Sequence, residues 1–257
     1  MAVETVFAEE RKMKIVEYIK NHRKATVGEL CDVFQVSSAT IRNDLRELES
    51  ISPIIRTHGG AMVKTQAGFE PSSREKRISG QAGKEKIGAA ALKFIETGDT
   101  IILDTGTTTM ELARLLSAKP DITVVTNDVR IAALLEDTEG ITVYLVGGKV
   151  RKGFHCTVGA AGRQMLSGIT ADKAFIGANG LSFEKGATTP HIGHAETKQA
   201  MIQASKKIFL LCDNSKLGRN AFAKFAPLDV IDTLITDSIS EEDKKRFEDE
   251  GIDVINT

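Results

Sequence analysis

Residues 35–49 combine side chains that could recognise a nucleic acid. The segment contains Arg42, Asn43 and Arg46 within five positions of one another. Arginine and asparagine can bond both the edges of bases and phosphate oxygens. Small hydroxyl residues that could also bond phosphate precede or interleave them, at Ser37, Ser38 and Thr40. The residue types therefore favour contact with the major groove of DNA.

The same segment has the pattern of a capped amphipathic helix. Ser37 can accept a hydrogen bond from the N–H groups that a first helical turn leaves unpaired. Apolar residues then recur at spacings of four and three, at Ile41, Leu45 and Leu48. This spacing predicts one buried stripe, and the arginines and the asparagine would face away from it.

The flanking residues predict a winged helix-turn-helix. Before this helix we expect a helix, a short β-prone segment and a second helix, at residues 11–23, 25–27 and 29–34. After it, two short apolar runs at 54–57 and 61–63 flank a Gly-Gly turn, which is typical of a β-hairpin. A hairpin in this position lies beside the phosphate backbone, so Arg56 and His58 are further candidates for DNA contact.

These residues resemble the N-terminal domain of DeoR-type bacterial transcriptional repressors. The resemblance rests on the wing sequence RTHGGA and on Arg11, Ile15, Ile19, Ser37, Thr40, Ile41, Arg42, Asn43, Asp44 and Leu45. One departure lies between helix and wing, where members usually carry a glycine-containing turn and this chain has Ser50-Ile51-Ser52-Pro53. Proline disfavours helical geometry in the residue before it, so we expect Ser52 to be extended.

Length and charge allow two domains of different character. The 257 residues carry a net charge of -1. Residues 1–87 hold 15 Lys and Arg against 12 Asp and Glu, whereas residues 88–257 hold 19 against 23. This asymmetry gives weak support to nucleic acid binding at the front end. We predict a DNA-binding domain at 1–64, a linker at 65–83 and an α/β effector domain at 84–257.

Cysteine usage and hydropathy restrict the remaining classes. Cys31, Cys156 and Cys212 are widely separated and show no zinc-ligand spacing, so we expect neither a metal site nor a disulfide. We also expect no cofactor. Apolar runs are too short for a membrane span, and the first ten residues are acidic where a signal peptide is basic. We therefore expect a cytoplasmic protein.

From Lys84 onward the sequence predicts a mostly parallel sheet covered by helices on both faces, because short apolar strands alternate with amphipathic helices. A helix is expected from Lys84 to about Gly98, and a short one at 73–78. The predicted strands are 100–103, 122–125, 141–146, 173–176, 208–212, 230–236 and 253–255. The predicted helices are 109–116, 128–135, 160–166, 195–205 and 241–249.

Ligands of such sheets bind beyond the carboxyl ends of the strands, and polar or glycine residues follow four of these strands. The first group, residues 104–109, reads DTGTTT between a strand and a helix, and its hydroxyls and N–H groups would suit a phosphate. It is not a Walker loop, since no Gly-Lys-Ser/Thr follows. The other three groups lie at 126–127, 147–148 and 213–216. Each alone is also typical of an ordinary turn.

These strand ends resemble the C-terminal effector domain of the same family, through DTGTTT, VVTND, LVGG, FIGANG, AETK and CDNSK. That domain is similar in fold to ribose-phosphate isomerases and CoA transferases, and it binds a phosphorylated sugar or a related intermediate. The resemblance implies that residues 105–108 hold the phosphate and that the others contact the sugar or line the cleft. The implied effector-binding residues are Asp104, Thr105, Gly106, Thr107, Thr108, Thr126, Asn127, Gly147, Gly148, Glu196, Lys198 and Lys216.

Two classes of function compete. A sugar-phosphate isomerase with an appended DNA module would need a positioned base. In ribose-phosphate isomerases an acidic run follows the middle strand, but Asn179 stands at the corresponding place, and an amide cannot act as a base. Other candidates for a base are Asp104, Glu196, His155, His191 and His194.

We instead predict a non-enzymatic repressor of a carbohydrate-utilisation operon, with no catalytic residue. Its partners would be double-stranded operator DNA, a phosphorylated sugar or sugar-derived effector, and further copies of itself in a dimer or tetramer. The sequence leaves activation of transcription, and DNA binding without a working effector site, as alternatives.

Overall fold

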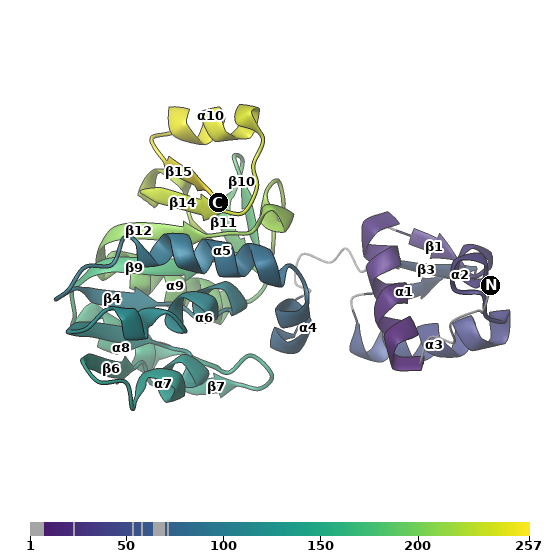
Figure 1. Ribbon diagram of the computed structural model, residues 1–257, viewed down its shortest axis with the longest axis horizontal. Helices are drawn as coiled ribbons and strands as arrows, with labels where there is room; N and C mark the ends of the chain where they lie inside the picture. Colours follow the sequence, from purple (N-terminus) through teal and green to yellow (C-terminus); the bar gives the residue numbers. More distant parts are fainter. Residues whose placement is uncertain (1–7, 23, 53, 58, 64–69, 71) are drawn as a thin grey trace. The chain divides into compact units, whose positions relative to one another are not determined.

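The computed structural model describes all residues except 1–7, 23, 53, 58, 64–69 and 71. The chain forms two compact units, Met1–Pro71 and Ser72–Thr257 (Figure 1). The predicted linker range, 65–83, overlaps both of them. Its last residues hold the helix α4 (Ser73–Ile78), as the sequence predicts, and the start of α5 (Gln81–Leu92).

The smaller unit is a winged helix-turn-helix. Its elements in chain order are α1 (Ala8–His22), β1 (Lys24–Thr26), α2 (Val27–Phe34), α3 (Ser38–Ile51), β2 (Ile54–Thr57) and β3 (Gly60–Val63). The strands form an antiparallel sheet in the order β1-β3-β2. Apolar side chains from all three helices and the sheet form one core, with Ile15, Leu30 and Ile41 fully buried. The predicted N-terminal fold is confirmed.

The ends of α3 follow from local chemistry. Ser37 caps the helix, because its Oγ accepts a hydrogen bond from the Thr40 N–H at 3.2 Å. At the other end Ser52 is extended, with φ -133° and ψ 166°, as expected of a residue before proline. Its N–H and Oγ both donate to the Leu48 carbonyl, at 2.7 and 2.6 Å, and so satisfy one of the last carbonyls of the helix.

The larger unit is built on seven parallel strands in the order β15-β14-β12-β9-β4-β5-β6. Their bounds are β4 (Thr100–Leu103), β5 (Ile122–Thr126), β6 (Ile141–Leu145), β9 (Ala171–Gly177), β12 (Ser205–Leu211), β14 (Thr233–Thr236) and β15 (Asp253–Asn256). The chain adds strands to one side of β4 and then to the other. Between β4 and β9 the order therefore reverses, and open α/β sheets bind ligands near such a point.

Helices cover both faces of this sheet, so the unit has three layers and two apolar cores. One core contains side chains from α5, α6 (Thr107–Ala113) and α7 (Val129–Leu135). The other contains side chains from α8 (Ala160–Ser167), α9 (Ile192–Gln203) and α10 (Glu241–Asp249). The predicted α/β class is confirmed. No described helix is both long enough and apolar enough to cross a membrane.

Several boundaries and short strands differ from the sequence prediction. Residues 228–230 form a 3-10 turn behind Pro227, so the strand predicted from Val230 begins only at Thr233. The helices predicted from 109 and 195 start earlier, at Thr107 and Ile192. The unpredicted strands are β7 (Lys149–Arg151), β8 (Cys156–Val158), β10 (Gly180–Ser182), β11 (Gly186–Thr189) and β13 (Ala223–Ala226). With three or four residues each, they are too short to show a strand period.

Candidate DNA-binding face and ligand site

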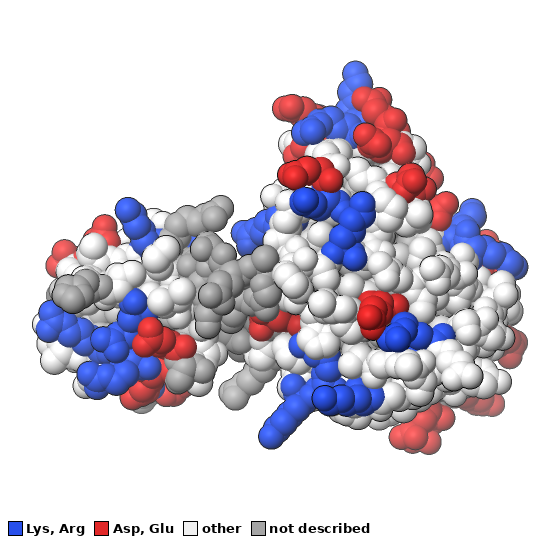
Figure 2. Space-filling model, turned by 180° about the vertical axis from the view of Figure 1, so that it is seen from behind, with Lys and Arg blue, Asp and Glu red and all other residues white. Residues whose placement is uncertain are grey.

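The outer face of α3 carries the predicted DNA-reading side chains. Arg42, Asn43 and Arg46 are exposed, whereas Ile41 and Leu45 beneath them are buried. Arg46 Nη1 donates to Asn43 Oδ1 at 3.2 Å. On the face drawn in Figure 2, basic side chains gather at one end of the smaller unit beside acidic ones. The buried stripe and the exposed face of α3 are therefore those that its sequence period predicts.

A buried ion pair fixes α3 against α1. Asp44 is 5% exposed and accepts hydrogen bonds from Arg11, with Nε at 2.7 Å from Oδ2 and Nη2 at 3.2 Å from Oδ1. Two parallel bonds of this kind define the angle between the groups as well as their distance. In the sequence, Arg11 and Asp44 stand out only through the family resemblance. In the structure they position α3 against α1.

The remaining predicted DNA contacts lie around the helix cap and the wing. Ser38 is exposed, and Thr40 is half-buried with its Oγ1 2.9 Å from Ser37 Oγ. Arg56 lies on β2, where its N–H donates to Glu49 Oε1 at 3.0 Å and its guanidinium is 3.9 Å from the same carboxylate. His58 lies outside the described residues.

In the larger unit, the loops after β4 and β5 are tied together. Thr105 N–H donates to Asn127 Oδ1 at 3.1 Å, and Thr105 Oγ1 donates to Asp128 Oδ2 at 2.6 Å. Asn127 also donates from Nδ2 to the Thr157 carbonyl at 3.1 Å and is 1% exposed. Its amide is therefore occupied in holding three segments together. Thr126 is fully buried beside it, where its Oγ1 accepts from the Asp128 N–H.

A shallow hollow lies over these loops and is rich in arginine. Its lining includes Ser73, Arg77, Thr105, Gly106, Thr107, Met110, Glu111, Arg114, Asp128, Arg130, Phe154 and His155. Three arginines face two carboxylates there, and one carboxylate, Asp128, already caps α7 and binds Thr105. The other, Glu111, lies 3.5 Å from Arg114. Guanidinium groups beside hydroxyls form a site suited to phosphate.

The arginines are the part of this site that the sequence analysis missed. They come from α4, from the end of α6 and from the first turn of α7. Because α6 has only seven residues, the anion argument depends on these charges and on the hydroxyls of the loop rather than on a helix terminus. The hollow has a cavity volume of about 30 Å³, and the rest of a ligand larger than a phosphate group would lie over its open side.

Asp104 and Lys198 form a buried ion pair at the point where the strand order reverses. Lys198 Nζ donates to Asp104 Oδ2 and, at 2.8 Å, to the Gly177 carbonyl, while the Gly177 N–H donates to Asp104 Oδ2 at 3.1 Å. Their side chains are 1% and 4% exposed. Burial raises the pKa of Asp104, and the charge of Lys198 opposes that rise. The pair joins β4, β9 and α9 beneath the surface.

Five other predicted ligand residues do not line the arginine hollow. Glu196 pairs with Arg163 at 2.6 Å, and Lys216 lies beyond β12 beside Asp213 and Ser215. Gly147 and Gly148 follow β6. Gly148 has φ 138°, and a Cβ there would lie 2.6 Å from the Val158 carbonyl oxygen, so the fold itself requires glycine. Thr108 is buried one residue beyond the hollow.

Two of the three histidine candidates for a general base, His191 and His194, have structural partners. His194 Nε2 lies 2.9 Å from Cys156 Sγ, and Arg151 Nη1 lies 3.1 Å from the same nitrogen. Burial first, and then the charge of Lys198, lower the pKa of His194 to about 2. Such a group is too weak a base to take up a proton at neutral pH. His191 caps α9, and His155 lines the arginine hollow.

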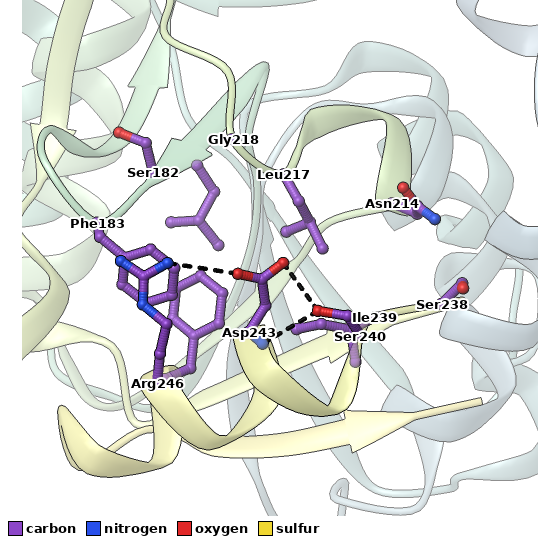
Figure 3. A pocket seen from close by; sticks show the side chains of 12 residues that line it. Ser182, Phe183, Asn214, Leu217, Gly218, Ser238, Ile239, Ser240, Asp243 and Arg246 are labelled. Carbon is purple, nitrogen blue, oxygen red and sulfur yellow. Dashed lines mark hydrogen bonds and ion pairs between the residues drawn. The ribbon is translucent and has the colours of Figure 1, made fainter.

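A second, larger cavity of about 400 Å³ lies beyond β12 and β14 (Figure 3). Phe183 packs there between the Arg246 guanidinium, 3.8 Å from its ring centroid, and the stacked ring of Phe247. Arg246 also lies 3.6 Å from Asp243. Size favours this cavity as a ligand site, but its single arginine is beside a carboxylate. An anionic ligand is better suited to the arginine hollow, because three arginines line it.

The sequence matches two family models. Residues 11–67 match the DeoR-like helix-turn-helix domain, and residues 79–238 match the DeoR C-terminal sensor domain. The chain is 41% identical to the HTH-type transcriptional repressor GlcR of Bacillus subtilis, over 91% of this chain and 90% of that one. It is 37% identical to the HTH-type transcriptional regulator GlpR of Haloferax volcanii, over 96% and 97%.

Likeness to solved structures is weaker. A ribose 5-phosphate isomerase A from Methanocaldococcus jannaschii is 18% identical, with a TM-score of 0.40 over 54% of this chain and 55% of that one. A likeness at this level carries no argument about activity.

Proposed function

The chain belongs to the DeoR family of helix-turn-helix transcriptional regulators, and on that premise we propose that it represses a carbohydrate-utilisation operon until a phosphorylated sugar or related metabolite releases it from DNA. The observation that carries this proposal is the hollow in which Arg77, Arg114 and Arg130 meet the hydroxyls of Thr105 and Thr107. A phosphate group carries close to two negative charges at neutral pH and accepts several hydrogen bonds at once.

On the DNA side, α3 would enter the major groove. Arg42, Asn43 and Arg46 would reach base edges and phosphates, and the capped first turn at Ser37, Ser38 and Thr40 would contact the backbone. The wing would lie along the phosphates with Arg56 and His58. A single recognition helix reads only a few base pairs, so we propose that a homo-oligomer binds repeated half-sites.

On the ligand side, the phosphate would lie among the arginines. Gly106 and Thr107 would contribute N–H and hydroxyl donors. Thr105 would hold the loop in place, because its hydroxyl donates to Asp128 at 2.6 Å and its N–H donates to Asn127. Because the hollow is shallow, the sugar would extend outward across Phe154 and His155. Asp104, Asn127 and Lys198 would then act beneath the site, by keeping the loops after β4, β5 and β9 in position.

The hollow also gives a route from ligand to DNA-binding unit. Ser73 and Arg77 belong to α4, the first described helix of the larger unit. The end of α4 is held by buried Lys84, whose Nζ donates to the Lys76 and Ser79 carbonyls. A phosphate bound to Arg77 would therefore contact the first described helix after the smaller unit in the chain. To change the ratio of the DNA-binding state to the released state from 99:1 to 1:99, the ligand must bind the released state more tightly by about 5.5 kcal/mol.

A sugar-phosphate isomerase with a DNA module is the alternative. The named relatives are transcriptional regulators, and the low pKa of His194 argues against it as a base. Incubation with pentose and hexose phosphates, followed by NMR of the sugar, separates the two functions. We expect the substrates to persist, and turnover at ordinary enzymatic rates would establish the isomerase instead.

Ligand binding itself can be tested by thermal unfolding of the full chain against a panel of sugar phosphates and the corresponding free sugars. A ligand that binds only the folded state raises the unfolding temperature by mass action. We expect stabilisation by at least one phosphorylated compound and none by its free sugar at the same concentration. Equal stabilisation by the phosphorylated compound and its free sugar would show that the phosphate group does not contribute to binding.

A further inference from the structure

The seven-stranded sheet has two edge strands, and they differ in their protection. The outer strand at one end, β15, begins with Asp253 and ends with Asn256, and α10 packs against it through the shared apolar core. At the other end, β6 reads ITVYL and contains no charged residue. Edge strands normally avoid pairing with other chains by means of charges, proline, bulges or cover. Apart from its pairing with β5, β6 shows none of these devices within the described residues.

An exposed apolar surface surrounds β6. Tyr144 and Leu145 on the strand are 52% and 44% exposed, and they are joined by Leu134 of α7 and Val150 of β7, at 41% and 56%. These are four of the seven large apolar side chains that stand exposed among the described side chains of residues 72–257. Tyr144 and Leu145 are consecutive in the strand, so apolar side chains are exposed on both faces of the sheet at this edge.

The charges around β6 indicate which partner fits. Three exposed acidic residues precede the strand, at Glu136, Asp137 and Glu139, and two exposed lysines follow it, at Lys149 and Lys152. Figure 2 shows the end of the larger unit that carries β6 and β7 in Figure 1, with basic side chains on one side and acidic ones on the other. A second copy in antiparallel orientation would place the acidic end of each strand against the basic end of the other. A parallel arrangement would oppose like charges.

We propose that two copies of this chain pair through β6, antiparallel and about a two-fold axis. The two sheets would then continue into one sheet, with Tyr144, Leu145, Leu134 and Val150 buried at the contact. A two-fold interface is closed, because the same surface serves both partners. This interaction surface rests on the proposed homo-oligomer and names where two copies would meet, and it does not depend on the identity of any ligand. It would join two larger units and so bring two DNA-binding units into one molecule.

The test is the mass of the full chain in solution, by sedimentation or light scattering over a range of concentrations. We expect Tyr144→Lys and Leu145→Lys each to raise the dissociation constant of self-association by about tenfold or more, since each places a charge at the apolar contact. Phe222→Lys is the matched control, because Phe222 is 61% exposed outside this surface and should leave the mass unchanged. A monomeric parent, or β6 variants with the parent's mass, would overturn the proposal.

Charge reversal tests the orientation. Asp137→Lys and Lys149→Asp should each weaken self-association, and the double variant should restore it, because it re-creates opposite charges across the two-fold axis. If the double variant is weaker than either single variant, the antiparallel arrangement is wrong.

Hydrogen exchange of the unmodified protein supplies a readout that does not depend on any variant. Alternate β6 amides point away from β5, and Ile141 N–H already donates to the Thr138 carbonyl. The proposal expects the remaining outward amides to be protected at concentrations where the chain self-associates and to lose protection on dilution. Rapid exchange of these amides in the associated protein would also overturn it.

Discussion

The recognition helix and the arginine hollow are built in different ways. The face of α3 comes from one continuous segment, in which Ser37 starts the helix and a single apolar stripe decides what faces outward. The hollow draws its lining from α4, the loop after β4, α6, α7 and the turn between β7 and β8. The first surface therefore depends on local order within one helix and its anchor, whereas the second depends on the larger unit keeping distant segments together.

The largest effect is expected from removing the Arg11–Asp44 ion pair that holds α3 against α1. Asp44→Ala would leave the largely buried Arg11 guanidinium without its 2.7 Å partner. We expect the smaller unit to lose about 3 kcal/mol of unfolding free energy, because an uncompensated buried charge is costly. Chemical denaturation followed by a probe in each unit measures this, and the larger unit should be unaffected.

Glu47→Ala is the control for that variant, since Glu47 also pairs across to α1, with Lys12, but is 60% exposed. It should change stability far less than Asp44→Ala does. Equal losses in the two variants would mean that burial of the Arg11 pair is not what secures the helix.

The hollow is next tested by Arg130→Gln, which removes one guanidinium and keeps a hydrogen-bonding side chain. We expect affinity for the phosphorylated ligand to fall by about 1.5 to 3 kcal/mol, the range for a hydrogen bond to a charged group. Operator affinity in the absence of ligand should stay at the parental value. Isothermal titration calorimetry and operator binding measure the two quantities separately.

Arg163→Gln is the matched control, because Arg163 pairs with Glu196 on the surface and does not line the hollow. Ligand affinity that drops equally in both variants would show a general effect of positive charge rather than a site.

The converse variant is Arg42→Ala on α3. We expect operator affinity to fall by about 1 to 3 kcal/mol at fixed salt, with ligand affinity unchanged. Lys14→Ala on α1, where Lys14 pairs with Glu10, should have a smaller effect. An Arg42→Ala protein that binds operator as tightly as the parent would show that this face of α3 does not enter the groove.

Acid should affect the larger unit through His194. Because its folded pKa is lowered to about 2 from an ordinary 6.5, the unfolded chain binds a proton that the folded chain excludes. Stability is therefore unaffected by this group well above pH 6.5 and falls as the pH drops through 6.5 toward the folded pKa. We expect a loss of about 1 kcal/mol by pH 5.5. His194→Gln should flatten this part of the stability profile, and an unchanged profile would contradict the assignment.

What the sequence could predict follows the same division. The period of Ile41, Leu45 and Leu48 predicts both the stripe and the exposed face of α3, because a helix is a local structure. The buried parallel strands are also recognisable, since strands covered on both faces read as apolar runs. Short antiparallel strands such as β7 and β10 pair with the strand that follows them in the chain, but their own three residues carry too little pattern to be recognised as strands.

For the ligand site, the loops at the strand ends could be predicted from the sequence, but the arginines that lie over them could not. The DTGTTT loop follows from its place after a buried strand. Arg77, Arg114 and Arg130 are ordinary surface residues in the sequence, and only the fold brings them over that loop. In the same way, Asp104 and Lys198 are 94 positions apart, and the sequence alone could not show that they bind one another.

The central claim is that a phosphorylated ligand in the arginine hollow decides whether α3 holds its operator. Fluorescence anisotropy of labelled operator DNA, with the full chain bound and a panel of sugar phosphates added, tests it most directly when parent and Thr107→Val are measured together. We predict that at least one phosphorylated compound releases the parent, and that Thr107→Val binds DNA nearly normally but is not released. A parent that no phosphorylated compound releases, or a Thr107→Val protein that is fully released, would contradict the claim.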